Sequence, residues 1–175
     1  MIRHACAAVL VVLATGHQVR AQAVSEEYRV KAAYLYNFVK YVEWPAEAGT
    51  GPVTICVAGR NPFGTVLQTL VRGERIGGRP IETRVILEPE PGCHVIFVPD
   101  GSATRAYLQG ATGMPVLTVG ESTTFIEQGG IANFYLERRN VRFEINPMAA
   151  ERAGIRISAR LLQLARIPDT RDQSR

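Results

Sequence analysis

The sequence has few of the residues that usually build a catalytic or metal site. Its 175 residues include three histidines and three cysteines, and no group of them has the spacing of metal ligands. Glycine-rich nucleotide motifs are also missing. Gly59–Val66 (GRNPFGTV) lies between a strand pattern and a helix pattern, but no Lys-Ser/Thr pair follows Gly64. The sequence therefore predicts no metal, no cofactor and no nucleotide chemistry.

The sequence also lacks a large excess of positive or negative charge. The chain has 20 Lys and Arg against 16 Asp and Glu. Arg3 and Arg20 fall in a segment that we expect to be removed, which leaves 18 against 16, an excess of +2. The positive residues are scattered and nearly all are arginine, whereas nucleic-acid-binding domains gather them into a stripe. Nucleic acid is therefore not expected as a partner.

Long hydrophobic runs are absent. The apolar run Ala5–Ala14 is shorter than the about 20 residues of a membrane-spanning helix, and no later segment is suited to span a bilayer. The run follows Arg3 and His4 and precedes Ala21-Gln22-Ala23, an order typical of a secretory signal peptide. We expect residues 1–23 to be removed on export, with a retained anchor as the alternative.

Cysteine remains in a single pair after that removal, because Cys6 leaves with the signal peptide. Cys56 and Cys93 each lie in or beside an apolar strand pattern. An even pair in an exported protein favours a disulfide. Two buried free thiols are the alternative.

Regular elements can be placed along most of the chain. Ser25 is a suitable N-cap for a helix that runs to about Trp44, where Pro45 stops it, and Asn61-Pro62 is expected to open a second helix. Further apolar runs and caps predict strands at 53–58, 81–87, 93–98 and 115–120, a short helix through 106–108, a helical turn near 125–126, and final helices begun by Asn146 and Ser158.

A β-hairpin is the clearest pattern and lies between Gly129 and Asn146. Apolar and polar residues alternate in both of its strands, and the polar run Glu137–Asn140 separates them. Alternation indicates one covered and one wet face, whereas the earlier apolar runs indicate buried parallel strands. The fold class is therefore α/β: a layered sandwich with a mainly parallel central sheet flanked by helices and the hairpin at its margin. It forms one domain over 24–168, followed by a disordered tail at 169–175.

Several strings of residues together resemble one protein family. They are KAAYLYNFVKYVEWP, ICVAG, CHVIFV, PVLTVGE, GGIANFYLE, VRFEINPMAAERAG and ISARLLQLAR. In this order they resemble the YfiR-like family of small bacterial periplasmic proteins.

The resemblance implies an α/β sandwich, a periplasmic location and a structural disulfide between Cys56 and Cys93. It also implies a non-enzymatic repressor that binds the periplasmic domain of an inner-membrane diguanylate cyclase, or of a sensor kinase, and limits cyclic di-GMP synthesis. A second, redox-labile bridge found in some members is absent here, since no further cysteine pair exists.

A regulator of this kind needs an exposed apolar patch for its partner. The candidate partner-binding residues are Tyr36, Tyr41, Trp44, Phe134 and Leu136, and each could instead belong to the core. A homodimer is a further interpretation that the sequence leaves open.

The alternative function is a periplasmic sensor that binds a small molecule. Ligands of open α/β sheets lie beyond the carboxyl ends of the parallel strands. The polar residues expected there are Arg60, Asn61, Asp100, Ser102, Glu121, Ser122 and Thr123. A serine hydrolase using Ser102 or Ser122 is disfavoured, because His94 is expected at the opposite edge of the sheet.

Overall fold

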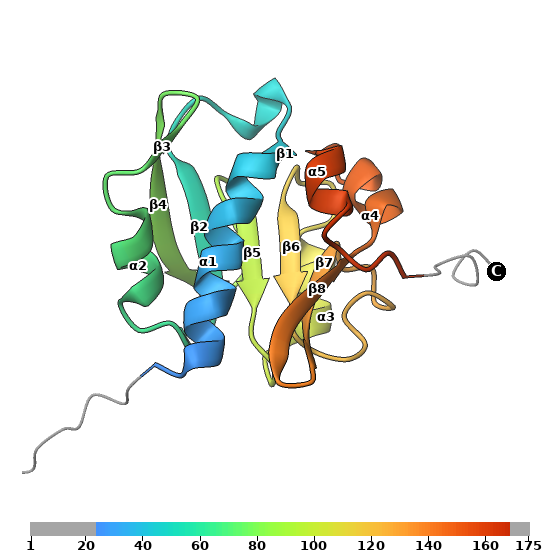
Figure 1. Ribbon diagram of the computed structural model, residues 1–175. Coiled ribbons are helices and arrows are strands. Elements are labelled where there is room, and N and C mark those ends of the chain that lie inside the picture. Colours follow the sequence, from blue (N-terminus) through green and yellow to red (C-terminus); the bar gives the residue numbers. More distant parts are fainter. Residues whose placement is uncertain (1–23, 169–175) are drawn as a thin grey trace, which may run out of the picture.

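The computed structural model describes residues 24–168, which form a mixed sheet with helices on both of its faces (Figure 1). The signal-peptide prediction for 1–23 and the tail prediction for 169–175 fall outside the described residues. Within 24–168, no helix is long and apolar enough to cross a membrane. The strands of the main sheet are β2 (Val53–Ala58), β3 (Arg75–Ile76), β4 (Arg79–Ile86), β5 (Val95–Val98), β6 (Leu117–Gly120), β7 (Ala132–Glu137) and β8 (Asn140–Ile145).

The strands lie in the order β3-β4-β2-β5-β6-β7-β8. Neighbours from β4 to β7 are parallel, and β3 and β8 pair antiparallel with β4 and β7 at the two margins. The predicted α/β sandwich with a mainly parallel sheet and a marginal hairpin is confirmed.

Helices cover the two faces unequally. They are α1 (Glu26–Tyr41), α2 (Val66–Val71), α3 (Thr104–Gly110), α4 (Pro147–Arg152), α5 (Ala159–Leu162) and a 3-10 turn, η1 (Ala46–Ala48). Figure 1 shows α1 in front of the sheet and α3 behind it, with α4 and α5 beside β6, β7 and β8. We call the two sides of the sheet the α1 face and the α3 face.

Helix α1 begins as predicted and ends early. The Ser25 hydroxyl accepts from the Tyr28 N–H at 3.4 Å, but the helix ends at Tyr41 instead of near Trp44. Val42–Glu43 forms strand β1, which pairs antiparallel with β9 (Arg156–Ile157). Pro45 disfavours helical geometry at the preceding residue, Trp44. Strand β9 also offers Val42–Glu43 a pairing partner, and a strand of two residues is too short to be predicted from the sequence.

The second helix begins at Val66 rather than at Asn61-Pro62. The Asn61 side chain builds a turn instead: its Oδ1 accepts from the Phe63 N–H and its Nδ2 donates to the Gly64 carbonyl, each at 2.9 Å. Gly64 has φ +52°, which a right-handed helix does not tolerate. The early start was therefore wrong, and Asn61 caps a turn.

The hairpin turns at Arg138 and Arg139, whose φ values of 49° and 69° are positive. Beyond it, Asn146 and Ser158 cap α4 and α5 as predicted, with side-chain oxygens accepting from Ala149 N at 3.1 Å and Leu161 N at 3.3 Å. The chain then returns along the outer edge of β8. There the Arg166 N–H donates to the Phe143 carbonyl at 3.1 Å, so part of the edge is covered.

The two faces differ in chemistry. The strand residues that face α1 are apolar and join Leu35 and Phe38 in the larger core cluster. Side chains alternate along a strand, and the α3 face carries the smaller cluster, which includes Tyr107 and Phe125. The buried polar strand residues and the histidine preceding β5 all belong to the α3 side: Thr54, His94, Thr118, Asn133 and Glu144.

The predicted disulfide is formed. Cys56 of β2 and Cys93, just before β5, are joined with 5.8 Å between their Cα atoms. Both residues belong to the smaller cluster on the α3 face. The bridge therefore joins two central strands on the face with the smaller apolar cluster.

Candidate functional site

Glu121 organises the carboxyl-terminal edge of the parallel strands. It follows β6 directly, and its Oε1 accepts from the Asp100 N–H at 2.8 Å and from the Tyr28 hydroxyl at 2.9 Å. Its Oε2 lies 2.6 Å from Lys31 Nζ, and both side chains are 5% exposed. Glu27 also contacts Lys31. We call Tyr28, Lys31 and Glu121 the strand-end cluster.

The strand-end cluster satisfies its own charges. Burial raises the pKa of the Tyr28 phenol, and the hydrogen bond to Glu121 and the negative charge of that carboxylate raise it further. The phenol therefore stays protonated and acts as a donor. Because a buried charge without a partner is costly, these contacts hold the first turns of α1 over the strand ends.

The other residues predicted to bind a ligand do not converge in the same way. Arg60, Asn61 and Thr123 are exposed, and Asn61 is used in its own turn. Ser102 lies near Gly59 in the loop after β2, because the Ser102 Oγ would be 3.9 Å from a Cβ added at Gly59. The Ser122 hydroxyl is buried without a hydrogen-bond partner among the described residues. A ligand at this edge stays a prediction.

Sequence reasoning found Glu121 as a candidate site residue but missed its contacts with Tyr28 and Lys31 of the first helix. A usable signal was present. Tyr28 and Lys31 are three residues apart and so share one side of α1, and Lys31 is a charged residue on a helix side that continues into apolar positions. Contact with Glu121 spans 90 residues of sequence, which local patterns cannot supply.

His94 lies before β5 at the other edge of the sheet and is 2% exposed. The Thr54 N–H lies 3.2 Å from Nδ1, and Arg79 Nη2 lies 2.7 Å from Nε2. Burial lowers the pKa of His94, and the positive charge of Arg79 lowers it further. Ser102 follows β5 and Ser122 follows β6, so both lie beyond the ends of these strands that are farther from His94. Each strand has four residues and so spans about 13 Å. This geometry does not form a Ser-His pair.

The predicted partner residues are scattered. Phe134 is 1% exposed and stacks on Phe38 with ring centroids 5.7 Å apart. Its prediction as a surface residue that binds a partner was therefore wrong. The side chain lies in the core because it points toward α1. Tyr36 and Tyr41 are half-buried, and the Tyr36 hydroxyl donates to Glu74.

Trp44 and Leu136 complete the predicted partner set. Trp44 is half-buried, and its Nε1 donates to the His94 carbonyl at 3.1 Å. Leu136 is exposed to 55%.

Leu136 borders a groove between the first half of α1 and the hairpin. The groove has a volume of about 620 Å³. Val30, Tyr34 and Val141 contribute apolar surface, and Glu26, Glu27, Arg139 and Arg142 supply charges of both signs around it. We call this the hairpin groove.

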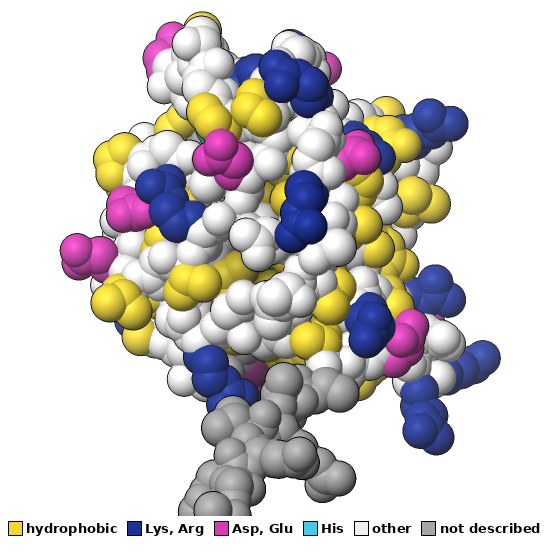
Figure 2. Space-filling model, turned by 90° about the vertical axis from the view of Figure 1, so that its left-hand side faces the viewer, with side chains coloured by type: hydrophobic (Ala, Val, Ile, Leu, Met, Phe, Trp, Pro, Cys, Tyr) yellow, Lys and Arg dark blue, Asp and Glu magenta, His cyan; other side chains and the backbone are white. Residues whose placement is uncertain are grey.

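The opposite margin of the sheet also exposes apolar side chains, but in a different setting. Figure 2 shows this side of the molecule, where hydrophobic side chains are interspersed with charged ones. Val85 and Leu87, in and just after β4, are exposed to 51% and 87%.

These features define a disulfide-bonded α/β domain with a mainly parallel sheet, a buried ion pair at the strand ends and an apolar groove beside its hairpin. The chain belongs to the YfiR/HmsC-like family, whose model matches residues 28–166. The family resemblance drawn from the sequence strings is therefore confirmed.

A solved structure shares the fold at low identity. It is the crystal structure of a conserved domain protein from Vibrio cholerae O1 biovar El Tor str. N16961, 15% identical, with a TM-score of 0.52. The match covers 80% of this chain and 59% of that one. At this identity the likeness concerns the fold alone.

Proposed function

We propose that this protein is a non-enzymatic periplasmic regulator that binds the periplasmic sensor domain of an inner-membrane signalling protein, a diguanylate cyclase, and represses it. The observation that carries this proposal is membership of the YfiR/HmsC-like family over residues 28–166. The Cys56–Cys93 bridge supports export, since disulfides persist in oxidising compartments.

We place the partner at the hairpin groove. Leu136 is a large apolar side chain with more than half its surface in water, beside a groove of about 620 Å³. Exposed apolar surface rimmed by charges is typical of protein interaction sites. The mixed charges of the rim suit a partner helix that presents an apolar stripe with flanking polar residues.

The test is co-purification of the mature protein with the inner-membrane diguanylate cyclases of the same organism, together with cellular cyclic di-GMP. Deletion of the gene is expected to raise cyclic di-GMP. Leu136→Asp is expected to weaken partner binding at least about tenfold, a loss of about 1.4 kcal/mol or more, and to raise cyclic di-GMP as the deletion does.

Leu87→Asp is the matched control, because it places the same charge on an exposed leucine at the other margin of the sheet. It is expected to bind the partner normally. Unchanged cyclic di-GMP in the deletion strain would refute repression of a cyclase. Equal loss of binding in the two variants would refute the hairpin groove while leaving the function standing.

A further inference from the structure

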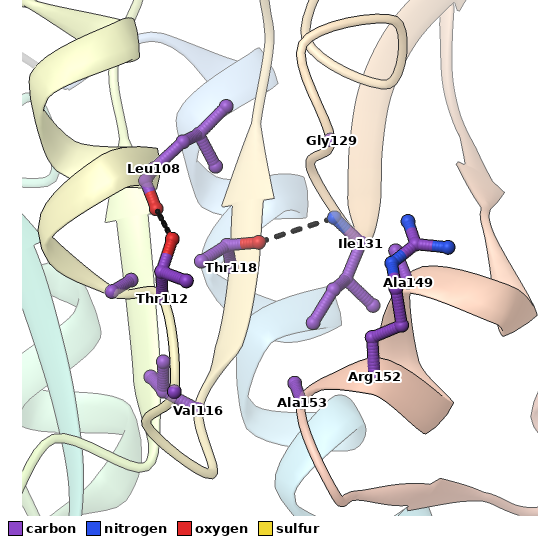
Figure 3. Close-up of a pocket in the computed structure, with 11 residues that line it drawn as sticks. Leu108, Thr112, Val116, Thr118, Gly129, Ile131, Ala149, Arg152 and Ala153 are labelled. Atoms are coloured by element: carbon purple, nitrogen blue, oxygen red, sulfur yellow. Dashed lines mark hydrogen bonds between the residues drawn. The ribbon is translucent and has the colours of Figure 1, made fainter. Parts of the chain in front are cut away.

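A second cavity lies on the α3 face, away from both the strand-end cluster and the hairpin groove. It has a volume of about 180 Å³ and opens between α3, β6 and α4 (Figure 3). Its apolar lining comes from Leu108, Ala111, Val116, Ile131, Ala149 and Ala153. We call it the α3–α4 cavity.

The α3–α4 cavity contains a buried hydroxyl with a free hydrogen. Thr118 of β6 is 5% exposed, and its Oγ1 accepts from the Ile131 N–H at 3.1 Å. Figure 3 shows this oxygen between α3 and the Ile131 backbone. This hydroxyl donates no hydrogen bond to another residue within 24–168, so its hydrogen is available to an atom inside the cavity.

A wider groove of about 470 Å³ continues from the cavity and shares Leu108, Thr112, Gly129 and Arg152 with it. Arg105, Gln109, Glu127 and Gln128 complete its polar lining.

Arg105 of α3 and Arg152 of α4 line this groove together with the Glu127 carboxylate, and within 24–168 neither guanidinium group makes a side-chain hydrogen bond or ion pair with another residue. Arg142, Arg156 and Arg166 instead have carboxylate partners. Both guanidinium groups therefore border the groove that continues from the cavity, and Arg152 also lines the cavity itself.

Size and chemistry together define the ligand class. A closed, dry protein cavity of about 150 Å³ accepts a benzene ring, and the α3–α4 cavity, which is open to solvent on one side, has a comparable volume of about 180 Å³. A guanidinium group binds a carboxylate or phosphate through two parallel hydrogen bonds. We propose that the α3–α4 cavity binds a small organic anion, with a ring-sized apolar group inside and its carboxylate or phosphate between Arg105 and Arg152.

Binding is tested on the mature, oxidised protein with four probes: phenylacetate, phenyl phosphate, the neutral analogue 2-phenylethanol, and acetate. Calorimetry and amide NMR give the affinity and the location. Phenylacetate or phenyl phosphate is expected to bind at least about tenfold more tightly than 2-phenylethanol and acetate, because only they fill both parts of the site. Amide shifts are expected around 108–113 and 129–131. Preference for one anion identifies the head group.

Arg152→Gln and Arg105→Gln are each expected to lower the affinity about tenfold or more. Arg72→Gln is the matched control, since it removes an exposed arginine outside the cavity lining and should leave binding unchanged. Both cavity arginines are exposed, so unfolding is not expected.

Equal binding of phenylacetate and 2-phenylethanol, equal loss in all three variants, or amide shifts confined to other residues would each overturn the proposal. The test does not involve the membrane partner, so its failure leaves the proposed repression untouched.

Discussion

Different interactions stabilise the α1 face and the α3 face of the sheet. The α1 face buries a large apolar cluster, and a buried ion pair lies at its rim, where Lys31 meets Glu121. The α3 face has the smaller cluster, a disulfide, several buried polar side chains and a cavity. Burial of apolar area stabilises the first face, whereas the second also depends on a covalent bond.

The two faces differ in whether their polar groups are bonded within the chain or free to bind a ligand. Glu121 is a polar residue at the strand ends, where α/β sheets usually bind ligands, yet its oxygens are occupied by other groups of the chain. The Thr118 hydroxyl donates no hydrogen bond within 24–168, and the guanidinium groups of Arg105 and Arg152 have no side-chain partner there. A converging set of polar residues thus indicates a binding site only when its members lack partners within the chain.

Loss of the disulfide should have the largest effect on stability. Cys56→Ala with Cys93→Ala is expected to lower the free energy of unfolding by about 4 kcal/mol, because the bridge closes a loop of 37 residues in the unfolded chain. Urea unfolding of the mature domain measures it. The wild-type protein under reducing conditions is the control and should lose a similar amount; a loss below about 1 kcal/mol in both would show that packing alone stabilises the α3 face.

Removal of the strand-end charge should cost somewhat less. Glu121→Gln keeps the shape of the side chain but leaves Lys31 with Glu27 alone, so we expect a loss of about 3 kcal/mol, at the lower end for a broken buried pair. Glu137→Gln is the matched control, because its ion pair with Arg142 is more than half exposed and is worth about 0.5 kcal/mol. Similar losses in the two variants would contradict a structural role for the strand-end cluster.

The features predicted correctly from the sequence depend on local signals. Asn146 and Ser158 act as caps, Val53–Ala58 forms a buried strand, and the hairpin lies at the margin. Each of these is specified by residues within a few positions of one another, as caps and alternation are.

The features that were missed depend on distant residues. Strand β1 exists because β9 pairs with it, and Phe134 is buried because the apolar side of β7 meets α1. Alternation fixes which residues share a side, but not which side faces the core. The α3–α4 cavity and the groove that continues from it bring together residues from 105 to 153, and no short sequence pattern joins them.

The smallest predicted effect concerns pH and the buried histidine of the α3 face. Burial and Arg79 hold the pKa of His94 below its usual value of 6.5, so the folded protein keeps this imidazole neutral while the unfolded chain takes up a proton below that pH. The contribution of neutral His94 to the free energy of unfolding is therefore fully present above about pH 6.5, and it is lost as the pH falls toward the folded-state pKa. His94 is the sole histidine in 24–168, so the decline between pH 7 and pH 5 should be its own.

Urea unfolding followed by the fluorescence of Trp44, the single tryptophan of the chain, measures this dependence. His94→Asn keeps an acceptor for the Thr54 N–H but cannot titrate. It is expected to lower stability at pH 7 and to flatten the slope between pH 7 and pH 5, because the proton uptake of the unfolded chain is removed. An unchanged slope in His94→Asn would assign the acid sensitivity to carboxylates, and the α3 face would then differ from the α1 face in its bridge and its cavity but not in its response to pH.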